Sequence, residues 1–409
     1  MPRPLHLWAF LQGIGHYPSG WRHENAKPAD VFSMDYYKRV GQLVERGCFD
    51  AIVFGDQIQS RGAGGHTPER LAMPTLDPMA LLSAIASVTE HIGLVNTLST
   101  TYWSAEGLAQ RFATMDRISG GRAGWNIVTS AHPDTAFNFG EEELPEKSLR
   151  YRMAAQVVAE AQEHWRAMNH ELGNSPQQRP VFVQAGQSAD GRDFAARVAE
   201  AIFCPAPTME AGIAFRNDMR ARVTAAGRDP DGVRIMPGLS FILAESEEAA
   251  IAKDQALLDL ADEALCIEYL SEGLGVDLTT CDPAGPIPED LILDQTILPR
   301  ADIARALEKP VATGLSLGKF AAGYVRTPRG HNVFRGTAAQ LAEMMITWVD
   351  AAACDGFTLQ PAYMPGELEL FVQEVVPILQ AAGVLRSAYP GQTLRETMGL
   401  PRWPADMAA

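Results

Sequence analysis

The stretch SGGRAGWNIVTS, residues 119 to 130, places two glycines and an arginine ahead of a short apolar run that ends at Asn126, Thr129 and Ser130. In an α/β chain, ligands bind at the carboxyl ends of the strands. Polar side chains that collect where an apolar strand stops therefore mark the place where chemistry is expected. The stretch predicts a buried strand with a tight entry and a functional exit at residues 126 to 130.

Similar apolar runs recur along the chain with helical stretches between them. Together with residues 122–130, they give eight predicted strands, the others lying at 5–10, 49–56, 91–100, 179–186, 200–206, 234–244 and 355–363. Near-continuous apolar strands are typical of a parallel sheet buried on both faces. Eight strands alternating with helices is the plan of a TIM barrel, so the sequence predicts an α/β fold of the (β/α)8 type.

Two stretches do not fit this repeat. Residues 57–76 form a loop rich in glycine and proline after the second strand, and a loop of that length in a compact domain is usually functional or disordered. Residues 245–336 combine a helical pattern with a turn-rich link, and we expect an insertion between strands seven and eight that folds over the barrel mouth as a lid. The prediction for residues 1–409 is a single barrel domain.

Composition narrows the classes of partner. The 409-residue chain carries a formal net charge of −16, which argues against nucleic acid or an anionic membrane surface and favours a small molecule. Five scattered cysteines without a C-x-x-C pair indicate a reducing, cytoplasmic compartment. No apolar run approaches the roughly 18 to 20 residues that span a bilayer.

Several familiar catalytic motifs are absent from the sequence. The nine histidines include no H-E-x-x-H pair and no Cys/His cluster at zinc spacing, so no metal site is predicted. The chain also lacks a nucleophile elbow and a phosphate-binding P-loop motif. The chemistry is therefore expected to depend on a bound organic group or substrate.

What remains is a set of polar strand ends. Strand two ends at Gly55 and Asp56, strand three at residues 99–101, strand four at 126–130 and strand five at Gln184-Ala185-Gly186-Gln187-Ser188. The last of these runs directly into a helix, where free backbone N–H groups and the positive end of the helix dipole suit a phosphate. Any one strand end alone is more simply an ordinary turn or helix cap, but four together favour a polar ligand.

Several of these segments resemble one known family. The residues that carry the resemblance are FGD (54–56), NTLSTTY (96–102), SGGRAGWNIVTS, NFG (138–140), RPVFVQAGQSADGRD (179–193), FRGT (334–337) and YPGQTLRETMGL (389–400). They match the bacterial-luciferase-like flavin monooxygenases, in the branch that contains nitrilotriacetate, EDTA and dibenzothiophene-sulfone monooxygenases. The likeness runs in the same order from about Leu5 to Leu400, and SGGRAGWNIVTS with VQAGQS is specific to this branch.

The resemblance implies a barrel that binds reduced FMN, supplied by a separate NAD(P)H:flavin reductase, and that uses O2 to oxygenate a small organic substrate. The residues it implies for FMN binding are Asp56, Thr100, Asn126, Tyr151, Gly186, Gln187 and Ser188. The electrostatic character of these positions is consistent with FMN, because the turn at the start of the helix suits the phosphate and the polar strand ends suit the ribityl hydroxyls. Family membership also implies a homodimer or homotetramer.

The resemblance places three candidate catalytic residues around flavin and substrate, namely His16, Ser130 and His331. Oxygenation needs a dry pocket and a group that hydrogen-bonds or protonates the reactive oxygen, for which histidine is suited. Among the aromatic strand residues, Phe10 and Phe54 lie near strand ends and are predicted to line the substrate pocket. His91 precedes strand three at the opposite end of the barrel and is expected to be structural.

The chain departs from the family pattern at three places. Lys147 stands where relatives often have histidine, four residues before Tyr151, and Phe137 replaces a basic residue before NFG. A long excursion that relatives carry between residues 169 and 175 is almost missing. The resemblance implies a small organic substrate containing sulfur or nitrogen, and these departures leave its identity open.

Three other functions compete with the oxygenase. A deazaflavin-dependent oxidoreductase of the same barrel class would transfer hydride without O2, but the branch-specific motifs count against it. A flavin-binding protein without turnover is supported by Lys147 and the missing segment. The retained His16, Ser130 and His331 count against it, because a protein that only binds flavin does not need them. A metal-dependent barrel hydrolase lacks its ligand clusters.

Overall fold

The computed structural model describes residues 3–17, 19–56, 76–131, 135–326 and 330–403. Apart from Leu76, the glycine- and proline-rich loop expected at 57–76 lies outside the described residues.

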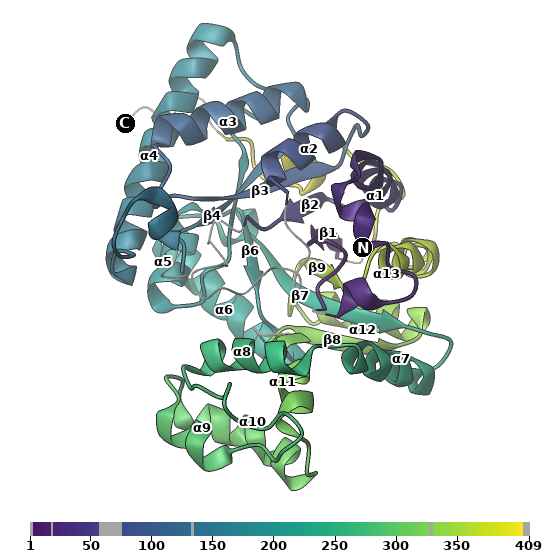
Figure 1. Ribbon diagram of the computed structural model, residues 1–409. Helices are drawn as coiled ribbons and strands as arrows, with labels where there is room; N and C mark the ends of the chain where they lie inside the picture. Colours follow the sequence, from purple (N-terminus) through teal and green to yellow (C-terminus); the bar gives the residue numbers. More distant parts are fainter. Residues whose placement is uncertain (1–2, 18, 57–75, 132–134, 327–329, 404–409) are drawn as a thin grey trace.

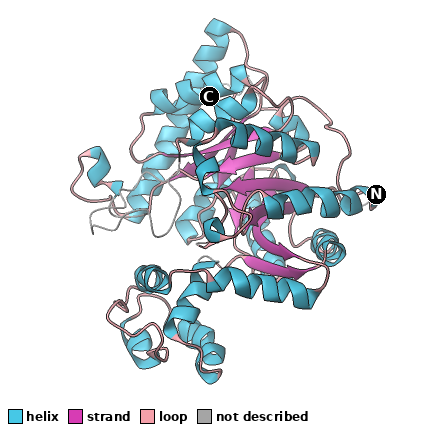
Figure 2. Ribbon diagram, turned by 45° about the vertical axis from the view of Figure 1, so that its right-hand side comes forward, coloured by secondary structure: helices cyan, strands magenta, loops and turns pink. Residues whose placement is uncertain are grey.

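Eight parallel strands close into a barrel, as the sequence predicts (Figures 1 and 2). Pairing runs β6-β5-β4-β3-β2-β1-β9-β7, and β6 also pairs with β7, which closes the ring. The strands of the barrel are β1 (His6–Leu11), β2 (Ala51–Phe54), β3 (Gly93–Ser99), β4 (Ala123–Val128), β5 (Val181–Gln184), β6 (Ala201–Cys204), β7 (Arg234–Leu243) and β9 (Gly356–Pro361). The fold is therefore a TIM barrel.

Helices surround the strands, and Figure 2 shows them outside the sheet. Those that alternate with the strands are α1 (Met34–Arg46), α2 (Pro78–Ala86), α3 (Ala105–Ile118), α4 (Lys147–Leu172), α5 (Ala189–Val198), α6 (Met209–Ala225) and α12 (Ala338–Asp350). Three shorter helices follow β9, namely α13 (Gly366–Leu370), α14 (Val376–Ala381) and α15 (Leu394–Thr397). None of the described helices is both long enough and apolar enough to cross a membrane.

The strand residues divide between two apolar cores. Trp8, Val53, Val95 and Val183 pack together inside the barrel, where Phe10 joins them. The neighbouring residues, such as Leu7, Ile52 and Leu94, pack outward against the helices. Because successive side chains of a strand point to opposite faces, both cores require apolar residues, which explains the near-continuous apolar runs.

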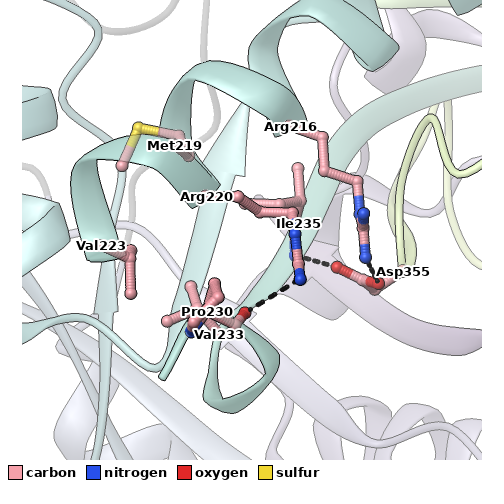
Figure 3. Close-up of a pocket in the computed structure, with 8 residues that line it drawn as sticks. All are labelled: Arg216, Met219, Arg220, Val223, Pro230, Val233, Ile235 and Asp355. Carbon is pink, nitrogen blue, oxygen red and sulfur yellow. Dashed lines mark hydrogen bonds and ion pairs between the residues drawn. The ribbon is translucent and has the colours of Figure 1, made fainter. Parts of the chain in front are cut away.

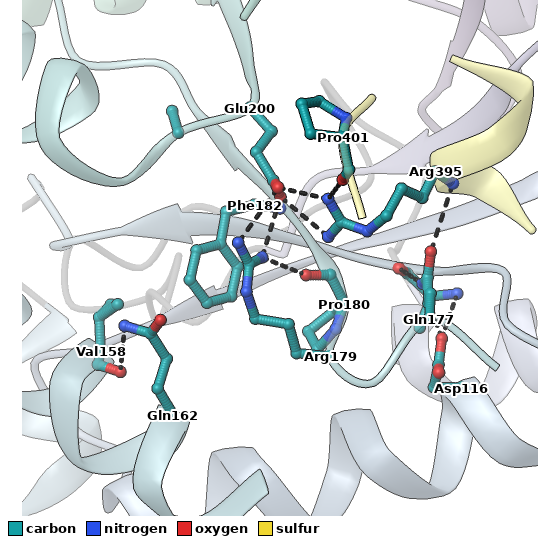
Figure 4. Close-up of polar contacts among 12 residues, drawn as sticks. Asp116, Val158, Gln162, Gln177, Arg179, Pro180, Phe182, Glu200, Arg395 and Pro401 are labelled. Carbon is teal, nitrogen blue, oxygen red and sulfur yellow. Dashed lines mark hydrogen bonds and ion pairs between the residues drawn. The ribbon is translucent and has the colours of Figure 1, made fainter. Parts of the chain in front are cut away.

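The C-terminal segment fills the bottom of the barrel, at the N-terminal ends of the strands. Leu394 of α15 belongs to the interior core, and a Cβ on Gly93 would lie 2.4 Å from its Cδ1 atom. Beside it, Glu200 pairs with Arg179 at 2.9 Å and with Arg395 at 2.5 Å (Figure 4). Burial alone would raise the pKa of Glu200, but the two guanidinium charges outweigh it and lower the pKa to about 2. This end of the barrel is locked by packing and ion pairs.

The structure adds one strand that the sequence analysis did not separate from the insertion. The strand β8 (Asn332–Gly336) pairs with the second half of β7, from Leu239 to Leu243, on the side where β6 pairs with the first half. The strand β7 is long enough to extend beyond the end of β6. The predicted insertion at 245–336 therefore returns to the sheet before α12 begins.

The rest of the insertion is helical. The helix α7 (Glu247–Asp259) follows β7, and the next four are α8 (Glu263–Leu274), α9 (Glu289–Gln295), α10 (Arg300–Ala312) and α11 (Leu317–Arg326). Helices α8 to α11 share an apolar core of their own, built around Leu270, Leu274 and Leu317. In Figure 1 they project from the side of the barrel where β8 and α12 lie. Whether residues 1–409 act as one domain stays a prediction.

Candidate active site

The polar groups at the two ends of the barrel differ: the charged ones at one end are paired with each other, and several at the other end lack a partner among the described residues. At the N-terminal ends of the strands a small hollow lies beside α6, and Arg216 and Asp355 are among the residues that line it (Figure 3). The hollow has no room for a water molecule. The Asp355 carboxylate accepts hydrogen bonds from Arg216 at 3.1 Å and from the backbone N–H of Ile235 at 2.9 Å. In TIM barrels this end contributes stability and the opposite end carries chemistry. The candidate site is therefore at the C-terminal ends of the strands.

The exit of β4 brings together residues that are separate in sequence. The Asn126 side-chain N–H donates to the Thr97 hydroxyl at 3.0 Å, while its Oδ1 atom is buried with no hydrogen-bond partner among the described residues. The hydroxyls of Ser99 and Ser130 lie 2.8 Å apart. Ser130 has a φ of 53°, an unusual backbone conformation for a residue other than glycine. An unpaired buried amide oxygen in β4, followed by a serine in an unusual backbone conformation after the strand ends, is an arrangement suited to a ligand rather than to packing.

The exit of β5 forms a cradle of two glycines. A Cβ on Gly186 would lie 2.6 Å from the Tyr151 hydroxyl of α4, and one on Gly191 would lie 2.7 Å from the same atom. Ser188 caps α5 by accepting a hydrogen bond from the Gly191 N–H at 3.2 Å. The Gly186 N–H donates to Gln184 Oε1 at 2.6 Å, so both glycine N–H groups are used within the turn, and the glycines serve to bring the backbone close to the tyrosine. The other backbone N–H groups at the helix N-terminus and the Tyr151 hydroxyl are the donors suited to an anion.

Gln187 connects this cradle to the neighbouring strand β6. Its side-chain N–H group lies 3.1 Å from the Ala185 carbonyl and 3.3 Å from the Phe203 carbonyl. Its Oε1 atom is buried and, within the described part of the chain, accepts no hydrogen bond. A second buried amide oxygen thus lacks a partner at this end of the barrel.

Four rings form a row across the barrel interior. Phe10 contacts His16 with ring centroids 4.9 Å apart and contacts Phe203 at 5.8 Å, while Phe203 stacks on His331 at 5.0 Å. Phe10 and Phe203 come from β1 and β6, which β9 and β7 separate in the ring, so their contact passes through the interior. The row therefore holds the two predicted catalytic histidines at opposite ends of one apolar surface.

The surroundings of His16 set its protonation. Its Nε2 atom lies 2.8 Å from the Phe10 carbonyl, which can only accept, so Nε2 carries the proton and Nδ1 is the acceptor. Burial lowers the pKa of His16 to about 4, against the opposing effect of this hydrogen bond. At neutral pH His16 is thus an uncharged imidazole whose Nδ1 atom accepts no hydrogen bond from the residues that the structure describes.

A glycine of β7 makes room for the imidazole of His331. His331 is buried directly before β8, and a Cβ on Gly238 of β7 would lie 2.4 Å from its Nδ1 atom. The absence of a side chain at Gly238 is what allows the imidazole to reach Phe203. The extra strand β8 is thus the element that brings His331 to the barrel.

The structure brings most of the predicted site residues to one end of the barrel. Asp56 lies two residues after the end of β2, and Thr100 directly follows β3 with its hydroxyl 3.2 Å from the Val128 carbonyl. Phe54 is the exception: it is buried in the core outside the barrel and contacts Tyr37 of α1 with centroids 6.1 Å apart. Its prediction as a pocket residue is not supported, because β2 places Val53 inward and Phe54 outward.

Sequence reasoning missed three residues at this end of the barrel. Phe203 lies in the row of rings, and Gly191 completes the cradle. Ser240 of β7 is buried with a hydroxyl that no described residue hydrogen-bonds. Phe203 could have been considered, because it is an aromatic residue of the predicted strand 200–206, but it stands in the middle of that strand and not at its end as Phe10 does in strand 5–10. No group of histidine, cysteine and carboxylate side chains suited to a metal occurs among the described residues.

Comparison with known proteins agrees with this geometry. The model of the luciferase-like monooxygenase family matches residues 15–277. The chain is 36% identical to N-acetyl-S-(2-succino)cysteine monooxygenase of Bacillus subtilis, over 98% of this chain and 97% of that protein. It is 33% identical to nitrilotriacetate monooxygenase component A of Aminobacter aminovorans, with the same coverage of the two proteins.

Solved structures show the same likeness. EDTA monooxygenase from Chelativorans sp. BNC1 superposes with a TM-score of 0.82 at 28% identity, and the match covers 99% of this chain and 100% of that one. The resemblance stated from sequence motifs is thereby confirmed over the full length of the chain. On this evidence the chain belongs to the luciferase-like monooxygenase family and is a flavin-dependent monooxygenase.

Proposed function

We propose that the protein is the oxygenase component of a two-component system that binds reduced FMN and oxygenates a small organic substrate. When bound, reduced FMN supplies the two electrons with which one atom of O2 enters the substrate and the other leaves as water. A separate NAD(P)H:flavin reductase would supply the reduced flavin. The relatives support this assignment, since one is named as component A of its monooxygenase and another as an FMNH2-dependent dimethylsulfone monooxygenase.

The observation that carries the proposal is the cradle of Gly186, Gly191 and Tyr151 at the N-terminus of α5. A phosphate fits such a place because backbone N–H groups, the positive helix end and a hydroxyl converge there. The unpartnered Oδ1 of Asn126 and Oε1 of Gln187 would accept hydrogen bonds from the N–H and O–H groups of a flavin. The residues present therefore fit FMN.

Asp56 and Thr100 stand at the ends of β2 and β3, next to Asn126 in the order of strands. We assign them to the same ligand, with Ser188 acting through the helix cap. Lys147 is the first residue of α4 and is exposed, which leaves Tyr151 as the residue of this helix that faces the cradle.

Each candidate catalytic residue has a different task. His16, uncharged at neutral pH, would accept a proton or a hydrogen bond at Nδ1 near the reacting oxygen. Ser130 would orient a polar group through its hydroxyl, which is hydrogen-bonded to the Ser99 hydroxyl. His331, stacked on Phe203, would hold or move a proton from the opposite end of the row of rings.

The rings of Phe10 and Phe203 would exclude water from the space between the histidines. Exclusion of water matters because an oxygenase must not release its activated oxygen as hydrogen peroxide. The substrate is proposed as a small organic molecule containing sulfur or nitrogen. A homodimer or homotetramer and a place in the cytoplasm remain predictions from the family resemblance.

The test is an anaerobic titration of the purified protein with reduced FMN, followed by rapid mixing with O2 while the flavin spectrum is recorded. The proposal expects a tight complex whose oxidation follows a time course different from that of free reduced FMN. Absence of binding, together with binding of a reduced deazaflavin, would replace it with the deazaflavin-dependent oxidoreductase. Binding with oxidation identical to that in free solution would indicate a flavin-binding protein without oxygenase function.

A further inference from the structure

One buried carboxylate ties together three segments near the candidate active site. Asp254 of α7 accepts a hydrogen bond from the Tyr17 hydroxyl at 2.8 Å and forms an ion pair with Arg326, the last residue of α11, at 2.8 Å. It also forms an ion pair with Arg335 of β8. Only 4% of Asp254 is exposed, so these contacts are made away from solvent, where they are strongest.

The three partners of Asp254 flank the two candidate catalytic histidines. Tyr17 directly follows His16, and the backbone N–H groups of both residues donate to the segment at the end of β9. Arg326 and Arg335 stand on either side of His331 in the chain. A single side chain thus holds the segment of one histidine and both sides of the segment of the other.

From this arrangement we infer that Asp254 is a positioning residue, which sets the separation of His16 and His331 across the row of rings. The inference rests on the proposed function, because it assumes that these histidines face the flavin and substrate. Asp254 contacts neither imidazole in the structure and acts through Tyr17, Arg326 and Arg335.

The chemistry of the contacts supports a fixed arrangement. Burial, and then the charge of Asp254, raise the pKa of Tyr17 well above its ordinary value, so its hydroxyl stays protonated and donates. The helix α7 and its C-cap residue Leu260 are held to the segment after β1 by two further hydrogen bonds. The Ser19 hydroxyl donates to the Leu257 carbonyl at 2.5 Å, and Arg22 donates to the Leu260 carbonyl at 2.8 Å. Asp254 is therefore the charged centre of a larger contact between α7 and the segment that carries His16.

Two guanidinium groups against one carboxylate also leave a surplus positive charge at this contact. Neutralising Asp254 would leave two cations close together without the one carboxylate that pairs with them among the described residues. We therefore expect Asp254→Asn to loosen both histidine segments, whereas Tyr17→Phe, which removes one hydroxyl, loosens only the segment of His16.

Hydrogen exchange on the intact protein tests the inference. Peptides covering residues 12–17 and 330–336 are compared between wild type, Tyr17→Phe and Asp254→Asn. We expect exchange about tenfold faster in 12–17 for Tyr17→Phe, as for the loss of one hydrogen bond to a charged group, and faster exchange in both segments for Asp254→Asn. The matched control is Tyr389→Phe, which removes a hydroxyl that donates to the Phe49 carbonyl at 2.8 Å at the other end of the barrel.

A second measurement separates positioning from simple anchoring. For Tyr17→Phe, affinity for reduced FMN should stay within about twofold, while the rate constant at which O2 oxidises the bound flavin changes at least about fivefold. Unchanged exchange in both segments, or faster exchange with an unchanged oxidation rate, overturns the inference. If the wild-type protein fails to bind reduced FMN, the proposed function fails, and the exchange experiment still decides what Asp254 holds.

Discussion

At the scale of single residues, Gly186 gives the sharpest test of the flavin site. A methyl group at this position would lie 2.6 Å from the Tyr151 hydroxyl and 2.8 Å from the Gln184 amide nitrogen, so the cradle must open. We expect Gly186→Ala to weaken binding of reduced FMN at least about tenfold, as measured by anaerobic titration. Adding Tyr151→Phe, which removes the clashing hydroxyl, should not restore the affinity fully, because the hydroxyl is itself a proposed contact.

The control for Gly186→Ala is Gly323→Ala in α11, where an added Cβ would have no atom of the described residues within 4 Å apart from its chain neighbours and the backbone of its own helix. It should leave the affinity for reduced FMN unchanged. Equal affinities for the two variants would show that the turn after β5 does not hold the cofactor.

His16 gives a prediction at the same scale about pH. Its pKa is lowered to about 4 in the folded protein from an ordinary 6.5, so between these values the unfolded chain binds more protons. The free energy of unfolding should therefore rise with pH across this window, by about 2 to 3 kcal/mol from His16 alone, and be lost again as the pH falls towards 4. Urea unfolding between pH 4 and 7 measures the slope, which should be smaller in His16→Asn.

The exposed histidine at the end of α4 is the matched control, since His170→Asn removes an imidazole from solvent rather than from the protein interior. Its slope should equal that of the wild type. An unchanged slope in His16→Asn would mean that His16 is charged or solvated in the folded state and is no neutral acceptor.

At the scale of elements, the N-terminus of α5 is predicted to do more than begin a helix. Ser188 caps α5 through the Gly191 N–H, and Thr208 caps α6 through the Ala211 N–H, both at 3.2 Å. Replacing either by alanine should cost about 1 kcal/mol of stability, because each change removes one N-cap. Only Ser188→Ala should also weaken reduced FMN binding; equal affinities would make the serine an ordinary cap.

Elements also show where sequence reasoning succeeds and fails. The eight barrel strands were predictable, because burial on both faces demands unbroken apolar runs. For the same reason the sequence does not tell which residues of a strand point into the barrel and which point towards the helices. Val53 and Phe54 are both buried, so only the structure shows Phe54 facing α1. The strand β8 was not predictable as a strand, since NVFRG is mostly half-buried and alternates in no clear pattern.

At the scale of the whole molecule, the site residues come from strands and loops far apart in sequence. Strand ends such as Asn126 and the Gly186 turn could be predicted, because a parallel barrel gathers all its carboxyl ends at one rim. The row of rings could not, because the contact between Phe10 and Phe203 depends on closure of the barrel between β6 and β7. At the opposite end the C-terminal segment fills the interior, where Leu394 joins the core of the barrel.

The lock at that opposite end gives the last prediction. Arg395 of the C-terminal segment and Arg179 before β5 share Glu200, whose pKa of about 2 shows that the folded state favours the ionised carboxylate. Arg395→Met should lower the free energy of unfolding by about 3 kcal/mol at pH 7, because it removes one of the two buried charges that compensate Glu200. Arg300→Met, which breaks an exposed ion pair with Asp294, should lower it by less than about 1 kcal/mol.

The pH dependence identifies Glu200 as the cause. A carboxylate with a lowered pKa stabilises the protein above its unfolded value near 4.5, and this stabilisation is lost as the pH falls towards 2. The difference between wild type and Arg395→Met in urea unfolding should therefore shrink from pH 7 to pH 3. Because the lock lies at the end of the barrel away from the proposed flavin site, the variant should bind reduced FMN normally at temperatures where it is folded. A loss of affinity in the folded variant would instead show that the two ends of the barrel are coupled.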